Sequence, residues 1–134
     1  MPDNNYEDKP FKSPRGDAIL QRQWRTKILV VPAGDSFSNE LDFRRAAGLA
    51  ITVDGNISAT HVAVRASPEE GGAKLPVYDD AGELLIAAAT GGTIISMHPE
   101  TFPLGYIALA LCSDADGTLT TEQSNMQFVA MVKP

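Results

Sequence analysis

The segment Leu75-Pro-Val-Tyr-Asp-Asp-Ala-Gly-Glu-Leu-Leu-Ile86 decides the fold class, because it has the pattern of a β-hairpin. An extended run ends at Tyr78, the next four residues form a turn, and an apolar run continues from Leu84 to Ala89. The Asp and Gly residues of the turn, 79–82, tolerate the left-handed conformations that a tight reversal needs. The same alternation of short runs and turn residues extends from Ile57 to Lys133, which predicts one β-strand after another.

Further strands are expected on both sides of this hairpin. Lys27–Val31 has the composition of a buried strand that ends at Pro32-Ala-Gly34, and Asp54-Gly55-Asn56 marks a turn after the strand expected at 46–53. Residues 41–45 fit either a short helical turn or an edge strand. The remaining strands are expected at 46–53, 57–66, 74–79, 83–89, 92–97, 104–112 and 124–133, with a compact turn at 98–103. Seven or eight strands without a sustained helical period predict an all-β fold, an antiparallel β-sandwich or jelly roll.

The two-residue period of a strand predicts which side chains enter the core. Val62, Val64 and Ala66 share one side of their expected strand. In the last strand, one side consists of Met126, Phe128, Ala130 and Val132. Since the domain must bury most of its apolar residues in its own core, we expect few large apolar side chains on its outer faces.

Composition sets limits on the class of protein. A chain of 134 residues with 43% hydrophobic residues suits one ordinary domain with a core of its own. A formal net charge of −6 argues against nucleic-acid binding through phosphates. No apolar run approaches the roughly 20 residues of a membrane helix, and the polar, acidic first eight residues do not resemble a signal peptide. We therefore expect synthesis in a reducing cytoplasm and no contact with a membrane.

Residues 1–26 differ from the β-domain expected at 27–134. They contain three prolines and many charged residues, too polar to form a core of their own. Two interpretations remain open for them, a disordered tail or an extended arm that becomes ordered on a partner. In the second interpretation the apolar anchors are Tyr6, Phe11, Ile19, Leu20 and Trp24, and Arg15, Arg22 and Arg25 add charge-assisted hydrogen bonds.

The sequence predicts no catalytic, cofactor-binding or metal site. Ile28–Ser36 resembles the start of a GDSL-type esterase, but the Asp-x-x-His pair that such an enzyme needs is missing. Asp114-Ala-Asp-Gly117 has the first residues of a calcium loop without its later ligands, which favours a hairpin turn. His61 and His98 are too few for a metal site by themselves. The single cysteine, Cys112, follows an apolar run and is expected to be a small buried thiol.

The region from about Ala47 to Lys133 resembles small structural proteins of tailed bacteriophages. The similarity rests on four motifs: Leu75-Pro-Val-Tyr-Asp-Asp-Ala-Gly82, His98-Pro-Glu-Thr-Phe-Pro-Leu-Gly105, Tyr106-Ile-Ala-Leu109 and Phe128-Val-Ala-Met-Val-Lys133. The chain departs from the pattern at Glu69–Lys74, where related sequences often carry an aromatic residue. These motifs form structure and carry no chemistry.

The resemblance implies a virion component, made in the host cytoplasm, and not an enzyme. A capsid decoration or cement protein fits best, with the major capsid protein or other virion subunits as partners. A neck, tail or fibre-attachment component and a carbohydrate-binding module are the alternatives, although the sole tryptophan lies in the arm and not in the β-domain. The resemblance also favours a homo-oligomer, with a trimer as the expected state, because a closed ring would cover exposed sheet edges.

Overall fold

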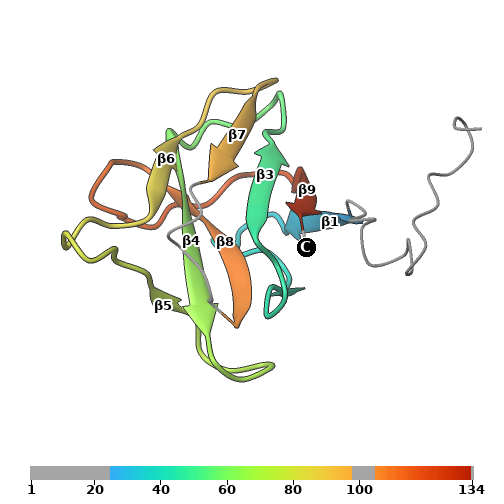
Figure 1. Cartoon of the computed structure of the whole chain (residues 1–134). Helices are drawn as coiled ribbons and strands as arrows, with labels where there is room; N and C mark the ends of the chain where they lie inside the picture. Colours follow the sequence, from blue (N-terminus) through green and yellow to red (C-terminus); the bar gives the residue numbers. More distant parts are fainter. Residues whose placement is uncertain (1–24, 98–104, 134) are drawn as a thin grey trace, which may run out of the picture.

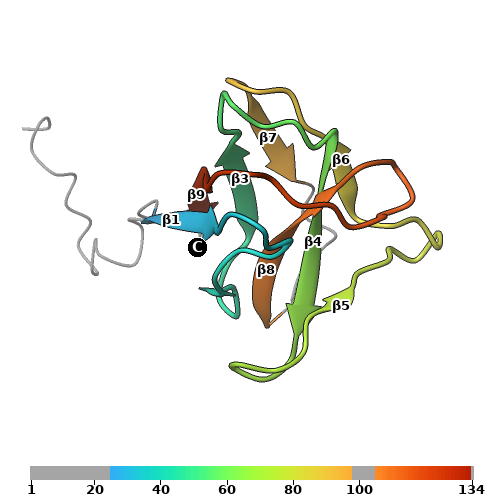
Figure 2. The same ribbon diagram turned by 180° about the vertical axis from the view of Figure 1, so that it is seen from behind.

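Nine β-strands, and no helix, make up the part of the chain that the structure describes. The computed structural model describes residues 25–97 and 105–133. Its strands are β1 (Arg25–Val31), β2 (Leu41–Asp42), β3 (Gly48–Thr52), β4 (His61–Ser67), β5 (Leu75–Pro76), β6 (Ile86–Ala88), β7 (Ile94–Met97), β8 (Tyr106–Cys112) and β9 (Met126–Lys133). They form a four-stranded sheet in the order β1-β9-β3-β7 and a five-stranded sheet in the order β2-β8-β4-β5, where β6 also pairs with β4. All pairs are antiparallel, which confirms the predicted antiparallel β-sandwich (Figures 1 and 2).

The strands lie where the sequence predicts them, but several have other bounds: the strand expected at 57–66 is His61–Ser67, and those expected at 74–79 and 83–89 shorten to Leu75–Pro76 and Ile86–Ala88. Residues 41–45, for which a helical turn and an edge strand were both open, supply β2, which pairs with β8 at the edge of its sheet. Strand β1 begins at Arg25, two residues before the expected start, because Arg25 and Thr26 continue the pairing with β9. The compact turn expected at 98–103 lies outside the described residues.

The core lies between the two sheets and follows the two-residue period of the strands. The side of β9 that was predicted to be buried is buried, as are Val62 and Val64 of β4, and Ala66 packs against the same cluster. The other strands contribute Leu29, Val31, Leu41, Leu49, Ile51, Ile107, Leu109 and Leu111. Because each buried aliphatic or aromatic side chain stabilises the fold by roughly 1.5–3 kcal/mol, this cluster is the main source of stability.

Strand β8 is buried on both of its faces. Ile107, Leu109 and Leu111 enter the core between the sheets, while Ala108, Ala110 and Cys112 lie on the opposite face and are also buried. The neighbouring strand places Ala63 directly opposite Ala110 on this outer side. Small side chains leave room for other parts of the chain to lie over them, so the outer side of this sheet can carry a further covering.

Side chains continue the hydrogen-bond ladder where the strands separate. The pairing of β3 with β9 ends at Ile51 and Ala130. Beyond that point the Val129 N–H donates to Thr52 Oγ1 over 3.0 Å, and the Gln127 N–H donates to an Asp54 carboxylate oxygen over 3.0 Å. These two bonds satisfy backbone donors of β9 that would otherwise lack a partner in the sheet.

The predicted turns use the aspartates that mark them in the sequence. Asp79 accepts hydrogen bonds from the Ala81 and Glu83 N–H groups, and this closes the hairpin between Tyr78 and Leu84. Asp114 accepts bonds from the Asp116 and Thr118 N–H groups in the turn between β8 and Leu119. Both carboxylates fix the reversal of the chain, which is the usual role of Asp at such positions.

Glu122 joins three separate segments of the sandwich. It is the one buried charged residue in the part of the chain that the structure describes. Its carboxylate accepts hydrogen bonds from the backbone N–H groups of Ser58 (2.9 Å) and Ala59 (2.6 Å) and from the Ser58 hydroxyl (2.7 Å). Its carbonyl oxygen accepts a bond from the Gly34 N–H over 2.9 Å. The carboxylate therefore fixes the segment that leads into β4.

We expect Glu122→Ala to lower the free energy of unfolding by about 2–3 kcal/mol, because two backbone donors lose a charged acceptor at a buried position. Urea unfolding of the purified chain measures this change. Glu83→Ala is the matched control, since Glu83 lies exposed in the hairpin turn, and it should change the free energy by less than about 0.5 kcal/mol. Equal effects of the two substitutions would contradict this role of Glu122.

Candidate assembly surfaces

The predicted partner-binding arm lies almost entirely outside the described residues. This applies to Tyr6, Phe11, Arg15, Ile19, Leu20, Arg22 and Trp24. Arg25 is described: it is the exposed first residue of β1 and is paired with Val132 of β9. Its role in binding a partner stays a prediction.

The residues considered for catalysis are engaged in structural hydrogen bonds. The Ser36 hydroxyl donates to the Thr120 carbonyl over 2.8 Å, which joins the segment beside β8 to the chain that follows Leu119. The Thr60 hydroxyl donates its one proton to the Ser113 carbonyl over 2.8 Å. His61 Nδ1, which lies 2.9 Å from the same hydroxyl, must therefore be the donor in that contact. His98 lies outside the described residues.

Asp114 and Cys112 also have structural surroundings. The hydrogen bonds from Thr118 hold the pKa of the Asp114 carboxyl below its ordinary value, and they fix this carboxylate in the turn. The Cys112 thiol is buried, as predicted, and this burial raises its pKa, so the less reactive protonated form is favoured. Among residues 25–97 and 105–133, no group of three or more His, Cys, Asp or Glu side chains is placed to hold a metal ion.

The outer side of the four-stranded sheet forms the most distinctive surface of the described chain. We call it the apolar face, and its strands alternate buried core residues with outward-pointing ones. The outward residues are Thr26, Ile28 and Val30 of β1, Gln127, Val129 and Met131 of β9, Ala50 and Thr52 of β3, and Ile94 and Ser96 of β7. Ile28 is 52% exposed and Ile94 is 64% exposed. The outer face of an antiparallel sheet is commonly polar, so this composition needs an explanation.

The outer side of the five-stranded sheet is covered in part by the chain itself. Arg65 lies over the Phe37 ring, with its guanidinium carbon 5.3 Å from the ring centre. Gly117 in the turn after β8 approaches the Leu84 side chain, which lies across the small residues of the sheet. Loop 68–74, which connects β4 to β5, is held by Glu40, the residue directly before the edge strand β2. The Glu40 carboxylate accepts hydrogen bonds from Lys74 Nζ (2.5 Å) and from the Gly71 N–H (2.8 Å).

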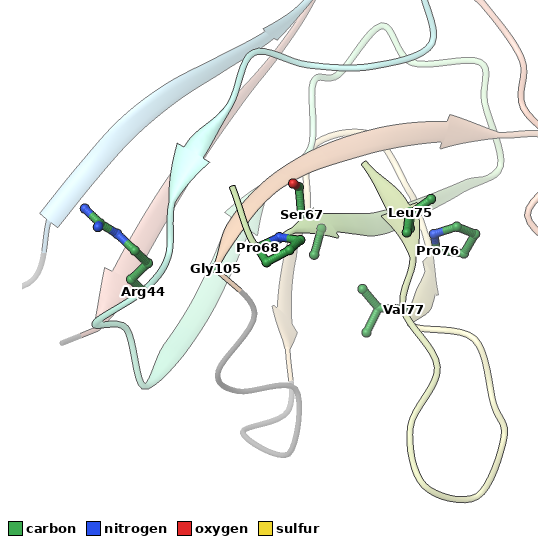
Figure 3. Close-up of a pocket in the computed structure, with 8 residues that line it drawn as sticks. Arg44, Ser67, Pro68, Leu75, Pro76, Val77 and Gly105 are labelled. Carbon is green, nitrogen blue, oxygen red and sulfur yellow. The ribbon is translucent and has the colours of Figure 1, made fainter. Parts of the chain in front are cut away.

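A shallow groove of about 470 Å³ lies where β4 ends and β8 begins (Figure 3). Arg44 borders one side of it and Leu75, Pro76 and Val77 border the other. Gly105, between them, has a φ of +83°, and a Cβ atom there would lie only 2.5 Å from the Ser67 carbonyl oxygen. The groove therefore depends on glycine at this position.

The charged group beside this groove already has partners. Arg44 pairs with both carboxylate oxygens of Asp42 (3.0 and 2.8 Å), and its guanidinium carbon lies 4.9 Å from the centre of the Tyr106 ring. The hydrogen bonds from Arg44 hold the pKa of the Asp42 carboxyl far below its ordinary value, and Arg25 adds to this effect. The groove is suited to apolar contact and contains no group placed for acid–base chemistry among its lining residues.

The sequence-based expectation that the outer faces carry few large apolar side chains is wrong. Ile28, Phe37, Leu75, Tyr78, Ile94 and Leu119 are all exposed. A signal for the apolar face was present in the sequence: Ile28–Val31 and Phe128–Val132 are apolar at every position, whereas a strand with one solvated face alternates with polar residues. A continuous apolar run predicts two covered faces, but only one face of these strands lies in the core.

Comparisons with known proteins do not identify a family. No family model matches the chain, and no curated protein matches it. Among solved structures, the crystal structure of the SPBc2 prophage-derived protein YomS is similar, with a TM-score of 0.49 and 12% sequence identity over 84% of this chain and 96% of that one. Within the described residues no helix has the length and apolar character needed to cross a membrane.

We expect acid to weaken the attachment of loop 68–74. Hydrogen bonds from Lys74 and the Gly71 N–H lower the pKa of Glu40 below its ordinary value of 4.5. A carboxyl with a lowered pKa in the folded state stabilises the fold fully above its unfolded pKa, and this contribution is lost as the pH falls through the folded value. The melting temperature of the wild type should therefore exceed that of Glu40→Gln near neutral pH, and the difference should shrink below about pH 4.5.

Thermal unfolding of both proteins from pH 7 to pH 3 measures this difference. Glu83→Gln, which changes an exposed carboxylate, is the control and should track the wild type throughout. A difference between wild type and Glu40→Gln that stays constant down to pH 3 would show that the carboxylate charge of Glu40 does not hold the loop.

Proposed function

We propose that this chain is a non-enzymatic structural protein of a tailed-phage virion that binds protein subunits of the assembled particle. The favoured position is the capsid, where the chain would act as a decoration or cement protein on the major capsid protein. Residues 1–26 and the apolar face are the two parts proposed to make contacts, and copies of the chain are expected to associate with one another.

The observation that carries the proposal is the apolar face. Soluble monomers rarely expose a contiguous apolar surface unless it binds another molecule. Ile28 and Ile94 stand at opposite edges of the face, Val129 and Met131 lie between them, and the strand residues of its centre carry no charge. Among the described residues, the strands of this face carry no acidic side chain, and the grooves border the five-stranded sheet. This favours a protein partner over a small molecule, which would need a concave site.

The resemblance described above supports a virion partner. Its motifs occupy fold-forming positions: Leu75–Gly82 contains β5 and the turn closed by Asp79, Tyr106–Leu109 lies in β8, and Phe128–Lys133 lies in β9. The hydrogen bonds of Ser36 and His61 support a structural role for these residues as well. Three of the four motifs that resemble phage structural proteins thus build the sandwich, and the fourth, at 98–105, lies outside the described residues except for Gly105.

Copy number in purified particles tests the proposal. Quantitative mass spectrometry of virions from the phage that encodes the chain should find hundreds of copies per particle if it decorates the capsid. A dozen copies or fewer would assign it to the neck or tail and contradict the capsid position. Absence from purified particles would contradict the virion role itself.

The arm should supply much of the attachment. We expect Trp24→Ala to weaken binding to particles about tenfold or more, because a fully buried aromatic side chain contributes roughly 1.5–3 kcal/mol. Occupancy is measured by adding the purified full-length variant to particles that lack the protein. Tyr78→Ala is the control, since Tyr78 is 56% exposed in the β5–β6 hairpin and distant in sequence from the arm. Equal binding of wild type and Trp24→Ala would contradict a role of this anchor.

A further inference from the structure

The apolar face is organised as two rows that run across the four strands. Pairing in the sheet places Thr26, Met131, Ala50 and Ser96 in one row. The second row contains Ile28 beside Val129, and Thr52 beside Ile94. In the first row the two central residues are apolar and the two outer residues carry hydroxyl groups. In the second row three of the four residues are apolar, and the fourth, Thr52, carries a hydroxyl group. The side chains are of moderate size, so the surface can pack closely against another sheet about 10 Å away.

The distribution of charge favours a second copy as the occupant. The chain has a formal net charge of −6, so two copies repel one another through most of their surfaces. No acidic residue lies on the strands of the apolar face, and among the described residues Lys133, at the end of β9, is the one charged strand residue on this side. A two-fold contact places a patch against itself, so a patch whose centre is uncharged and whose one lysine lies at the end of a strand gives little like-charge repulsion.

The polar groups of the face are also suited to self-association. Thr26, Thr52, Ser96 and Gln127 each carry a group that can donate and accept a hydrogen bond. Such groups can pair with their own symmetry mates, whereas a face bearing only donors or only acceptors cannot. A polar periphery around an apolar centre is the usual composition of a protein–protein contact.

We propose that the apolar face is the contact between two copies of this chain, packed sheet against sheet about a two-fold axis. This deepens the proposed function, on which it rests for the role of the face in protein contact: it assigns the apolar face to a second copy and leaves residues 1–26 to bind other virion subunits. The two copies can pair whether or not the chain enters a virion. Four strands about 4.8 Å apart and five residues long give a flat area of roughly 300–350 Å² per copy. This is below the roughly 800 Å² per partner of stable complexes, so the dimer is expected to be reversible and dependent on concentration.

Sedimentation equilibrium of the full-length chain over a range of concentrations tests the proposal. The wild type should show a monomer–dimer equilibrium. Ile28→Glu and Ile94→Glu should each weaken the dimer at least tenfold, because they place an unpaired carboxylate in an apolar contact. Leu75→Glu is the matched control: Leu75 is 62% exposed on the other sheet, and this variant should dimerise like the wild type. Thermal unfolding confirms that the variants are folded.

Mixtures of charged variants test the two-fold geometry. An axis parallel to the strands places β1 opposite β7 of the partner, whereas an axis across the strands places β1 opposite β1. A mixture of Ile28→Lys with Ile94→Glu should recover the dimer in the first arrangement, and Ile28→Lys with Ile28→Glu should recover it in the second. Recovery in neither mixture would overturn the two-fold contact.

Three further results would overturn the proposal. In the first, the wild type stays monomeric and a protease cleaves residues 1–24 faster in Ile28→Glu than in the wild type. This result would indicate that the chain covers its own apolar face. The second is a monomer without that change, which would leave the face to a different protein. The third is a trimer whose stability is unaffected by Ile28→Glu, which would place the copy–copy contact elsewhere.

Discussion

The burial of both faces of β8 is the constraint on which the arrangement of the five-stranded sheet depends. One face of β8 supplies large aliphatic residues of the core. The other face begins at Tyr106 and continues with the small residues Ala108, Ala110 and Cys112. Since these outer residues are small, other segments can lie over them, and Phe37 and Arg65 do so. Larger residues there would displace this covering. The two sheets of the sandwich therefore differ: one carries its own outer cover, and the other presents an apolar surface.

This asymmetry separates the two kinds of apolar exposure in the protein. Around the five-stranded sheet, exposed residues such as Phe37 have contacts with other side chains of the same chain. On the four-stranded sheet, Ile28 and Ile94 stand on a flat surface whose neighbours are also apolar or uncharged. Because acidic groups dominate the protein as a whole, an uncharged sheet face is the surface on which electrostatic repulsion opposes contact least.

Much of the fold could be predicted from the sequence, because its signals are local. The alternation along β9, the Asp79 and Asp114 turns and the buried Cys112 all follow from residues close together in the chain. Glu122 and the Ser58–Ala59 backbone are 63–64 positions apart, so no local pattern marks their contact. The pair of Glu40 and Lys74 was missed for the same reason. The apolar face was missed because the domain was expected to bury most of its apolar residues in its own core. The arm residues other than Arg25 lie outside the described chain.

The side chain of Asn39 has a consequence for how far any assembly of this protein can extend. Strand β1 is the outermost member of its sheet, and its Val30 N–H already donates to Asn39 Oδ1 over 2.8 Å. Lys27 Nζ donates to the Glu40 carbonyl over 2.8 Å and holds the same segment against the strand. A strand from another molecule could pair with the edge of β1 only by displacing both of these hydrogen bonds. Addition of a further strand is thus opposed at the β1 edge of this sheet.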